Sequence, residues 1–275
     1  MMLQLKRLKI SFFVLLLINT QSFGQVNPGA RQIALSHSDI AFSEEVFSLF
    51  NNPAGLAYLI NREVGLFYSP APFGVKELSS GFGAYVEPTS IGSFSGGFMI
   101  YGFDLYKETK ILFGFGRKIT NTFSVGLSAV YRNISIINYG SKGNLSFNLG
   151  SSLILLEMVS IGASIENATN STVGNEENQL PVVFNSGIGI KILNDFKTFM
   201  AIRKELNYDL SIMLGAEYNI FDFLQLRIGT ATEPNTFSGG FGLKFNFLTA
   251  EYAVLSHPDL DLTHQFGLVI QLKNE

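Results

Sequence analysis

The residues best suited to catalysis lie near the C-terminal end of the chain, where Ser256, Asp259, Asp261 and His264 occur close together. Serine, histidine and aspartate can act as nucleophile, base and orienting acid in hydrolases. The same residues are also ordinary constituents of a polar turn between two strands, and no second constellation supports a catalytic site. The sequence therefore favours a polar turn and predicts that the protein is not an enzyme.

The sequence offers no motif for a metal or a cofactor. The histidines His37, His257 and His264 lack a metal-ligand spacing such as His-x-x-x-His, and the chain has no cysteine. The glycine pairs at 114–116 and 187–189 lie in strand-like sequence, with no helix after them to bind a phosphate. We therefore expect no metal and no cofactor. The net charge of −3 gives no reason to expect nucleic acid as a partner.

The first 24 residues have the features of a signal peptide. A basic stretch at 6–9 precedes an apolar run, Ile10–Ile18. This run is far shorter than the roughly 20 residues that a membrane-spanning helix needs, which disfavours a transmembrane anchor. Small residues before Gln25 favour cleavage after Gly24. The absence of cysteine excludes a lipoprotein anchor and disulfide bonds.

The composition narrows the fold class. Charged residues make up 15% of the chain, against roughly 25% in a typical soluble domain. The chain is rich in Phe (26), Tyr (10) and Gly (27), and after the signal peptide it has no apolar run long enough for a membrane helix. These features fit a transmembrane β-barrel or a secreted β-sandwich, so the periodicity of the strands has to decide between them.

From about Glu63 onward the sequence alternates between apolar and small polar residues. Phe123, Val125 and Leu127 point one way, for example, and Ser124 and Gly126 point the other. Segments of about ten residues suit tilted membrane strands, and the second face is too poor in charge for the surface of a soluble sandwich. Turn signals divide 62–275 into about fourteen strands. We therefore predict an all-β fold, a transmembrane antiparallel β-barrel.

The segment 25–61 does not alternate. Ala30–Phe50 has a helical texture with Ser38 or Asp39 as a possible cap, and Asn52-Pro53-Ala54-Gly55 predicts a tight turn. One interpretation is a helix and turn that lead into the first strand. The other is an N-terminal helical hatch, or plug, inside the barrel, which would explain the small, uncharged residues on the inner face.

The parity of the strands assigns two sets of residues to the lumen. Inward charges are expected to pair with one another or with the hatch, because buried charges need partners. These charges are Arg132, Glu166, Glu217, Arg227, Lys244 and Glu251. Inward apolar residues could line a binding pocket for an apolar molecule. They are Val130, Ile154, Met213 and Leu255.

Short motifs resemble those of a known family. Gly29-Ala30-Arg31 followed by Asn52–Leu56 resembles the N-terminal segment of the FadL-like (OMPP1/FadL/TodX) outer-membrane proteins, and is closest to their PorV/PorQ branch. Tyr68-Ser69-Pro70, Leu105–Glu108 and Asp261–Leu268 also match. The resemblance implies a fourteen-stranded barrel with an N-terminal hatch, embedded in the lipid of the bacterial outer membrane.

Two functions follow from this resemblance. The first is passive transport of hydrophobic small molecules. It predicts a continuous lumen or a lateral opening that leads to an apolar pocket near the hatch. The alternative is a non-transporting component or accessory of type IX protein secretion, which predicts secretion-system proteins as partners and a sealed lumen.

Overall fold

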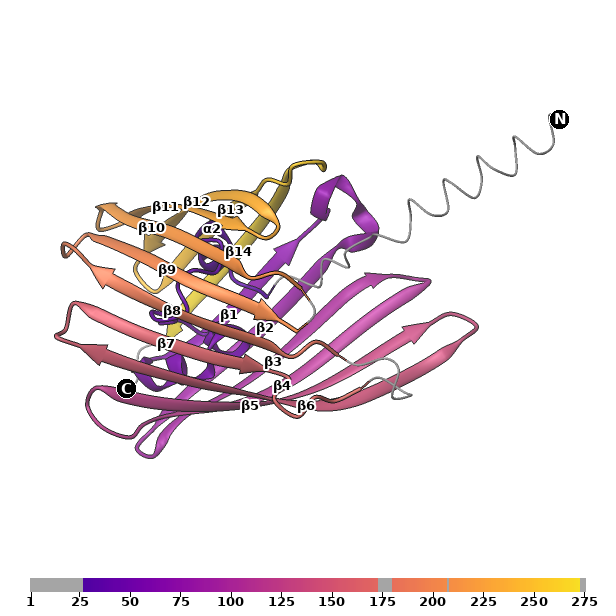
Figure 1. Cartoon of the computed structure of the whole chain (residues 1–275), viewed down its shortest axis with the longest axis horizontal. Helices are drawn as coiled ribbons and strands as arrows, with labels where there is room; N and C mark the ends of the chain where they lie inside the picture. The colour runs from indigo at the N-terminus through magenta and orange to yellow at the C-terminus, as the bar shows by residue number, and fades with distance from the viewer. Residues whose placement is uncertain (1–26, 173–179, 207, 273–275) are drawn as a thin grey trace.

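Fourteen antiparallel strands form one closed barrel, in which each strand pairs with its neighbours in sequence and the first strand pairs with the last (Figure 1). The computed structural model describes residues 27–172, 180–206 and 208–272, so the predicted signal peptide, 1–24, lies outside the described residues. The predicted fourteen-stranded barrel is confirmed. Its first seven strands are β1 (Arg62–Ser69), β2 (Ser80–Thr89), β3 (Gly92–Phe103), β4 (Tyr106–Lys118), β5 (Phe123–Ile136), β6 (Gly140–Leu155) and β7 (Val159–Glu166). The others are β8 (Val183–Lys191), β9 (Phe196–Glu205), β10 (Ser211–Phe221), β11 (Leu224–Thr232), β12 (Asn235–Phe245), β13 (Leu248–Leu255) and β14 (Thr263–Leu272).

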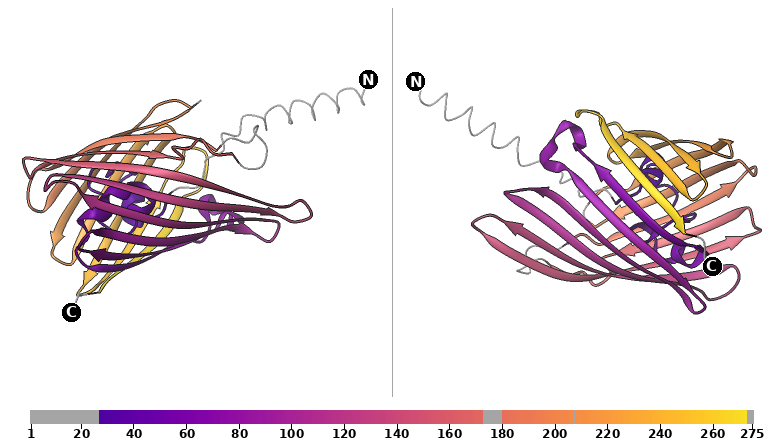
Figure 2. Two further views of the ribbon diagram at one scale, coloured as in Figure 1. Left: turned by 90° about the horizontal axis from the view of Figure 1, so that it is seen from below. Right: turned by 180° about the vertical axis from the view of Figure 1, so that it is seen from behind.

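The wall of the barrel is taller on one side. β3 to β6 have 12 to 16 residues each, whereas β7 has 8 and β8 has 9. β6 begins as early as Gly140, because Ile136 to Arg132 of β5 supply ladder partners for residues 140–144. The β5–β6 hairpin therefore projects beyond its neighbours (Figure 2).

The two ends of the barrel differ in their connections. Tight turns join β2 to β3, β10 to β11 and β12 to β13, and β1 begins and β14 ends at this same end. We call it the short-turn end. At the opposite end the connections 70–79, 167–182 and 256–262 are longer.

Large apolar side chains cover the outside of the barrel. Phe113, Ile228 and Phe237 are 68%, 67% and 64% exposed, whereas the inward Ser124 and Ser128 are fully buried. Such a continuous apolar surface is unfavourable in water and favourable against lipid chains. The observed alternation therefore matches a membrane barrel and not a soluble sandwich.

Aromatic residues gather at the turns of the short-turn end. Phe221 and Phe223 stack at the β10–β11 turn, with ring centroids 5.3 Å apart. Phe245 and Phe247 lie at the β12–β13 turn, where they are 74% and 59% exposed. Aromatic girdles of this kind mark the boundary between lipid chains and water in membrane barrels.

The N-terminal segment (residues 27–61) lies inside the barrel (Figure 1). It contains the short helix α2 (Ala30–Ala34), the helical turn α3 (Ser48–Asn51) and the 3-10 helix η1 (Pro53–Tyr58). α2 packs on β11 to β14 and η1 on β3 to β6, so the segment reaches both sides of the lumen. No helix among the described residues is long and apolar enough to cross a membrane.

The prediction of a helix within Ala30–Phe50 with Ser38 or Asp39 as its cap is wrong. No helix begins at Ser38 or Asp39: α2 ends at Ala34, Ser36 and His37 adopt left-handed backbone angles with φ of 50° and 57°, and the next helical residues are those of α3. Asp39 forms an ion pair with Arg31 instead of a cap, and the Ser38 hydroxyl donates to the Leu35 carbonyl. Contacts with the barrel wall thus override the local helical periodicity.

A charge on the outer face tests the location of this surface. Phe113→Arg, near the middle of β4, is expected to lower the free energy of unfolding by about 2–4 kcal/mol, because the guanidinium would lie in the lipid core. Urea unfolding in lipid vesicles measures this change, with Phe113→Leu as the apolar control. Equal stability of the two variants would contradict a lipid-facing position.

Candidate functional site

The interior of the barrel has an apolar side formed by β1 to β5. Phe47 and Phe50 of the N-terminal segment pack against Phe67 of β1 and Phe82 of β2, respectively. The two segment rings also contact each other, as do the two wall rings, and all four centroid distances are 5.6–6.4 Å. Edge-to-face pairs at these distances add to the stabilisation from burial. The cluster continues over the inner faces of β3, β4 and β5 through Met99, Leu112 and Val130.

Inward glycines let the N-terminal segment lie directly against the wall. A Cβ atom on Gly126 would overlap the backbone of Pro53 and Ala54, and one on Gly162 would overlap the backbone of Ile40. The segment and the wall therefore touch through main-chain atoms, with no layer of side chains between them. Other glycines that face main-chain atoms of the segment are Gly116, Gly150, Gly215 and Gly229, whereas those that face its side chains are Gly65, Gly97, Gly114, Gly187 and Gly240.

The predicted turn motif makes this close contact. The Asn52 side chain accepts a bond from the Ala54 amide at 3.2 Å and donates to the carbonyls of Ile40 and Ser151 at 2.9 and 3.2 Å. It thereby begins η1 and ties the segment to β6. The Ser124 hydroxyl donates to the Ala54 carbonyl, and a Cβ atom on Gly55 would overlap the Ser43 carbonyl.

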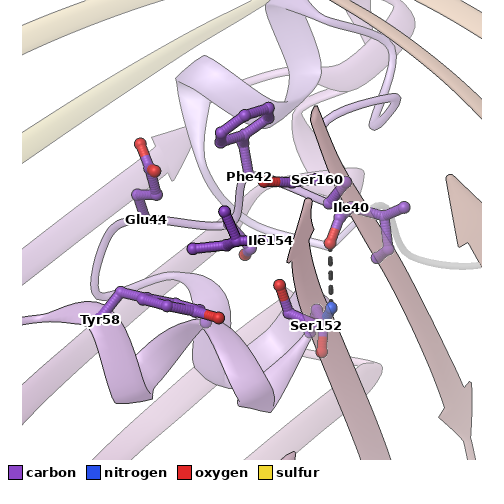
Figure 3. Close-up of a pocket in the computed structure, with 11 residues that line it drawn as sticks. Ile40, Phe42, Glu44, Tyr58, Ser152, Ile154 and Ser160 are labelled. Atoms are coloured by element: carbon purple, nitrogen blue, oxygen red, sulfur yellow. Dashed lines mark hydrogen bonds between the residues drawn. The ribbon is translucent and has the colours of Figure 1, made fainter. Parts of the chain in front are cut away.

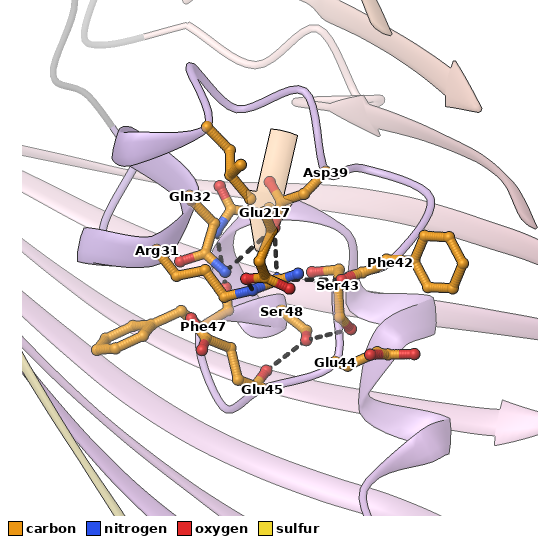
Figure 4. A network of polar contacts seen from close by, with 12 residues as sticks. Arg31, Gln32, Asp39, Phe42, Ser43, Glu44, Glu45, Phe47, Ser48 and Glu217 are labelled. Carbon is orange, nitrogen blue, oxygen red and sulfur yellow. Dashed lines mark hydrogen bonds and ion pairs between the residues drawn. The ribbon is translucent and has the colours of Figure 1, made fainter. Parts of the chain in front are cut away.

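The other side of the interior carries a chain of buried ion pairs that we call the polar chain, Asp39–Arg31–Glu217–Arg227–Glu251. Figure 4 shows its part around Arg31, Asp39 and Glu217. Arg31 Nη1 lies 2.8 Å from Asp39 and Nε lies 2.9 Å from Glu217. Arg227 Nε lies 2.8 Å from Glu217 and Nη1 lies 2.8 Å from Glu251. All these side chains are at most 8% exposed, so each charge depends on its partner instead of on water.

Arg31 thus connects the N-terminal segment to the wall. It also donates to the Phe42 carbonyl at 3.2 Å. Burial acts to lower the pKa of Arg31, but the carboxylates of Glu217 and Asp39 outweigh it and raise the pKa, so the side chain stays charged.

The six inward charges of the sequence prediction lie in three places. Glu217, Arg227 and Glu251 belong to the polar chain, and Lys244 lines the cavity beside it. Arg132 lies 3.2 Å from Glu108, between β4 and β5. Glu166 accepts bonds from Asn27 and Asn185 at 3.2 Å each and lies 3.6 Å from Arg203.

Sequence reasoning missed the partners Arg31, Asp39 and Glu108. Glu108 follows the inward parity of β4 and could have been found from it. Arg31 and Asp39 lie outside any alternating pattern, so no periodic signal indicates that they enter the lumen. Only the Gly29-Ala30-Arg31 motif marks Arg31.

A polar cavity of about 260 Å³ lies beside the polar chain. Glu63, Thr249, Lys244 and Gln271 line it near the short-turn end, and among its described lining residues Val269 alone is apolar. Glu45 also borders this cavity, and burial together with the nearby Glu251 carboxylate raises the pKa of Glu45 to about 8. The cavity suits water and polar groups better than hydrocarbon.

The four predicted apolar lumen residues do not line one open pocket. Val130 belongs to the large apolar core, and Leu255 packs against that core. Met213 packs in a separate cluster with Ile40, and Ile154 lines a small pocket between the N-terminal segment and β6–β7 (Figure 3). The apolar lumen is therefore divided and filled by the segment.

The residues suited to catalysis do not assemble. His264 Nδ1 lies 2.6 Å from the Tyr252 hydroxyl, whereas the Ser256 hydroxyl donates to the Phe237 carbonyl. Asp259 and Asp261 lie in the 256–262 connection. The part of the chain that the structure describes contains no group of three or more His, Cys, Asp or Glu that could hold a metal ion.

Comparison with solved structures shows the same barrel in hydrocarbon channels. The monoaromatic hydrocarbon channel CymD matches with a TM-score of 0.75 at 12% identity, over 92% of this chain and 100% of that chain. The Pseudomonas putida toluene transporter TodX matches with a TM-score of 0.67 at 14% identity, over 92% and 99%. A Pseudomonas aeruginosa FadL homologue matches with a TM-score of 0.62 at 11% identity, over 90% and 97%.

The chain has the fold of FadL- and TodX-like outer-membrane barrels. No family model matches the sequence, and the comparison with curated proteins gave no match. These structural neighbours are described as channels and transporters, and the absence of an enzymatic activity in this chain stays a prediction from the sequence. Assignment to the PorV/PorQ branch stays a prediction that rests on the short motifs.

Removal of Arg31 tests the connection between segment and wall. Arg31→Met leaves Asp39 without its cation. We therefore expect the free energy needed to detach the segment from the wall to fall by about 3–5 kcal/mol. Because the chain has no other thiol, Ser43→Cys serves as an isosteric reporter whose labelling by a maleimide should accelerate. The control is Arg62→Met, because its pair with Glu87 is exposed to solvent and contributes little to stability. Equal labelling rates in the two variants would disprove the role of Arg31.

Proposed function

We propose that the protein is a passive transporter of hydrophobic small molecules in the bacterial outer membrane. The observation that carries the proposal is the apolar inner side of a closed membrane barrel, formed by β1 to β5 around Phe67 and Phe82. Porins conduct polar solutes through a water-filled, polar lumen. An apolar inner wall instead provides favourable contacts for hydrocarbon.

The location follows from the outer face and the ends of the barrel. The apolar outer surface and the aromatic residues at the turns suit lipid and its boundary with water. Short turns are typical of the periplasmic side of such barrels and longer connections of the outside, so we place the short-turn end in the periplasm.

The N-terminal segment is proposed to act as the hatch of this transporter. It contacts strands on both sides of the lumen, and main-chain contact with inward glycines leaves little space between it and the wall. Passage to the periplasm then requires a displacement within the segment. We propose bounds of 25–61 for the hatch and 62–275 for the barrel, after a signal peptide of 1–24.

The solved channels support this function through the shared fold. CymD and TodX are described as a monoaromatic hydrocarbon channel and a toluene transporter, so a small aromatic hydrocarbon is the first substrate to test. The neighbours lend no support to secretion-system partners. A role as an accessory of type IX secretion stays a prediction from the family resemblance.

Uptake of radiolabelled toluene by intact cells tests the transport. Deletion of the gene is expected to reduce uptake, and a plasmid copy of the gene should restore it. A copy with Leu255→Asn should restore about tenfold less uptake, because a half-buried apolar contact at the edge of the inner wall is lost. Leu255→Met conserves volume and should restore uptake. Unchanged uptake in the deletion strain would contradict the proposed function.

Ion conductance in planar bilayers tests the hatch. The intact protein is expected to conduct little, whereas a variant that lacks 27–59 should form an open, water-filled pore, since a fourteen-stranded barrel is wider than its own side chains fill. Heat-dependent electrophoretic mobility confirms that the shortened chain still forms a barrel. A folded variant without increased conductance would show that the segment does not close the lumen.

A further inference from the structure

The small pocket between the N-terminal segment and β6–β7 contains three hydroxyl groups without a hydrogen-bond partner in the described part of the chain. They belong to Ser43, Tyr58 and Ser152. Ser43 and Ser152 are only 4% and 3% exposed. A buried hydroxyl group normally finds a partner, because it has lost its bonds to water. Three unpartnered hydroxyls around one pocket therefore point to a polar group that the pocket receives.

The shape of the pocket limits that group. Its volume is about 10 Å³, close to what one water-sized group occupies. Tyr58 extends from η1 with its hydroxyl toward Ser152 of β6 (Figure 3). One hydroxyl of a ligand fits among these side chains, and the rest of the ligand has to lie outside the pocket.

The surroundings of the pocket are apolar on one side. Ile40, Phe42 and Ile154 line it together with the hydroxyls. Ile40 packs with Met213 and Phe42 packs edge-on against Phe199 at 6.0 Å. These contacts suit the apolar body of a small molecule.

Glu44 borders both this pocket and the polar cavity, and its side chain is 47% exposed. A bare hydrocarbon in the pocket would leave the hydroxyls without partners, whereas a hydroxylated molecule gains hydrogen bonds with them.

The charge of the pocket discriminates against acids. No basic residue lines it among the described residues, and Lys197, which lies over the Phe42 ring, pairs with Glu44 at 3.2 Å. A carboxylate in the pocket would have to compete with Glu44 for that cation. The three hydroxyls can both donate to and accept from a neutral hydroxyl group.

We propose that this pocket binds the hydroxyl group of a small neutral amphiphile, a phenol or a short alcohol, and that the protein prefers such compounds to the parent hydrocarbons. The proposal rests on the proposed function, since it names the class of molecule that is transported. It requires no covalent step.

Equilibrium dialysis with the full-length protein in lipid nanodiscs tests the preference, with radiolabelled phenol and benzene as probes and empty nanodiscs subtracted. Phenol should bind saturably and more tightly than benzene. The double variant Ser43→Ala/Ser152→Ala should weaken phenol binding about fivefold for each hydroxyl removed and leave benzene binding unchanged. Ser95→Ala is the control, because this buried hydroxyl donates to the Tyr85 carbonyl away from the pocket.

Tyr58→Phe tests the pocket a second time without a change in volume. It should weaken phenol binding in a protein whose thermal stability is unchanged, so the test does not depend on the folding of the double variant. Absence of saturable phenol binding, or equal loss of phenol and benzene binding in the variants, overturns the proposal. Toluene uptake by cells is a separate readout: if uptake depends on the gene but phenol is not preferred, this inference fails and the proposed function stands.

Discussion

The width of the barrel is the constraint on which the rest of the structure depends. A closed sheet of fourteen strands encloses more space than the side chains of its own wall fill, and an apolar void of that size would be unfavourable. The N-terminal segment occupies this space. The inward glycines make room for the segment, because only a residue without a side chain lets a second backbone lie against the wall. Gly126 faces Pro53 in this way, and Gly162 faces Ile40.

Once the segment is inside, its charges must be compensated. The Arg31 side chain is buried in the lumen, and it lies between Asp39 of its own segment and Glu217 of β10. Glu217 in turn is shared with Arg227, which lies directly opposite it across the β10–β11 ladder. Such a chain contributes little net stability compared with apolar packing, but it leaves few alternative positions for the segment.

The polar chain and the phenylalanine cluster hold the segment from opposite sides. Phe47 and Phe50 face the apolar wall, while Arg31 faces the charged one. The space that remains reflects this division, since the larger cavity is polar and the apolar side is filled. A hydrophobic molecule therefore has favourable contacts along the wall but needs a displacement within the segment to pass. At the small Ser43–Tyr58–Ser152 pocket, three hydroxyls are left without partners among the described residues.

The sequence by itself determined the strands and their two faces, because the alternation of residues such as Phe123 and Ser124 is a local property of extended chain. It also determined which charges point inward, among them Glu217 and Arg227. The tertiary structure alone decided which partners those charges have. Arg31 and Asp39 come from a segment without periodicity, in which the helix expected to begin at Ser38 or Asp39 does not form. Contacts between residues nearly two hundred positions apart, such as Arg31 and Glu217, depend on barrel closure and strand register, which no local pattern encodes.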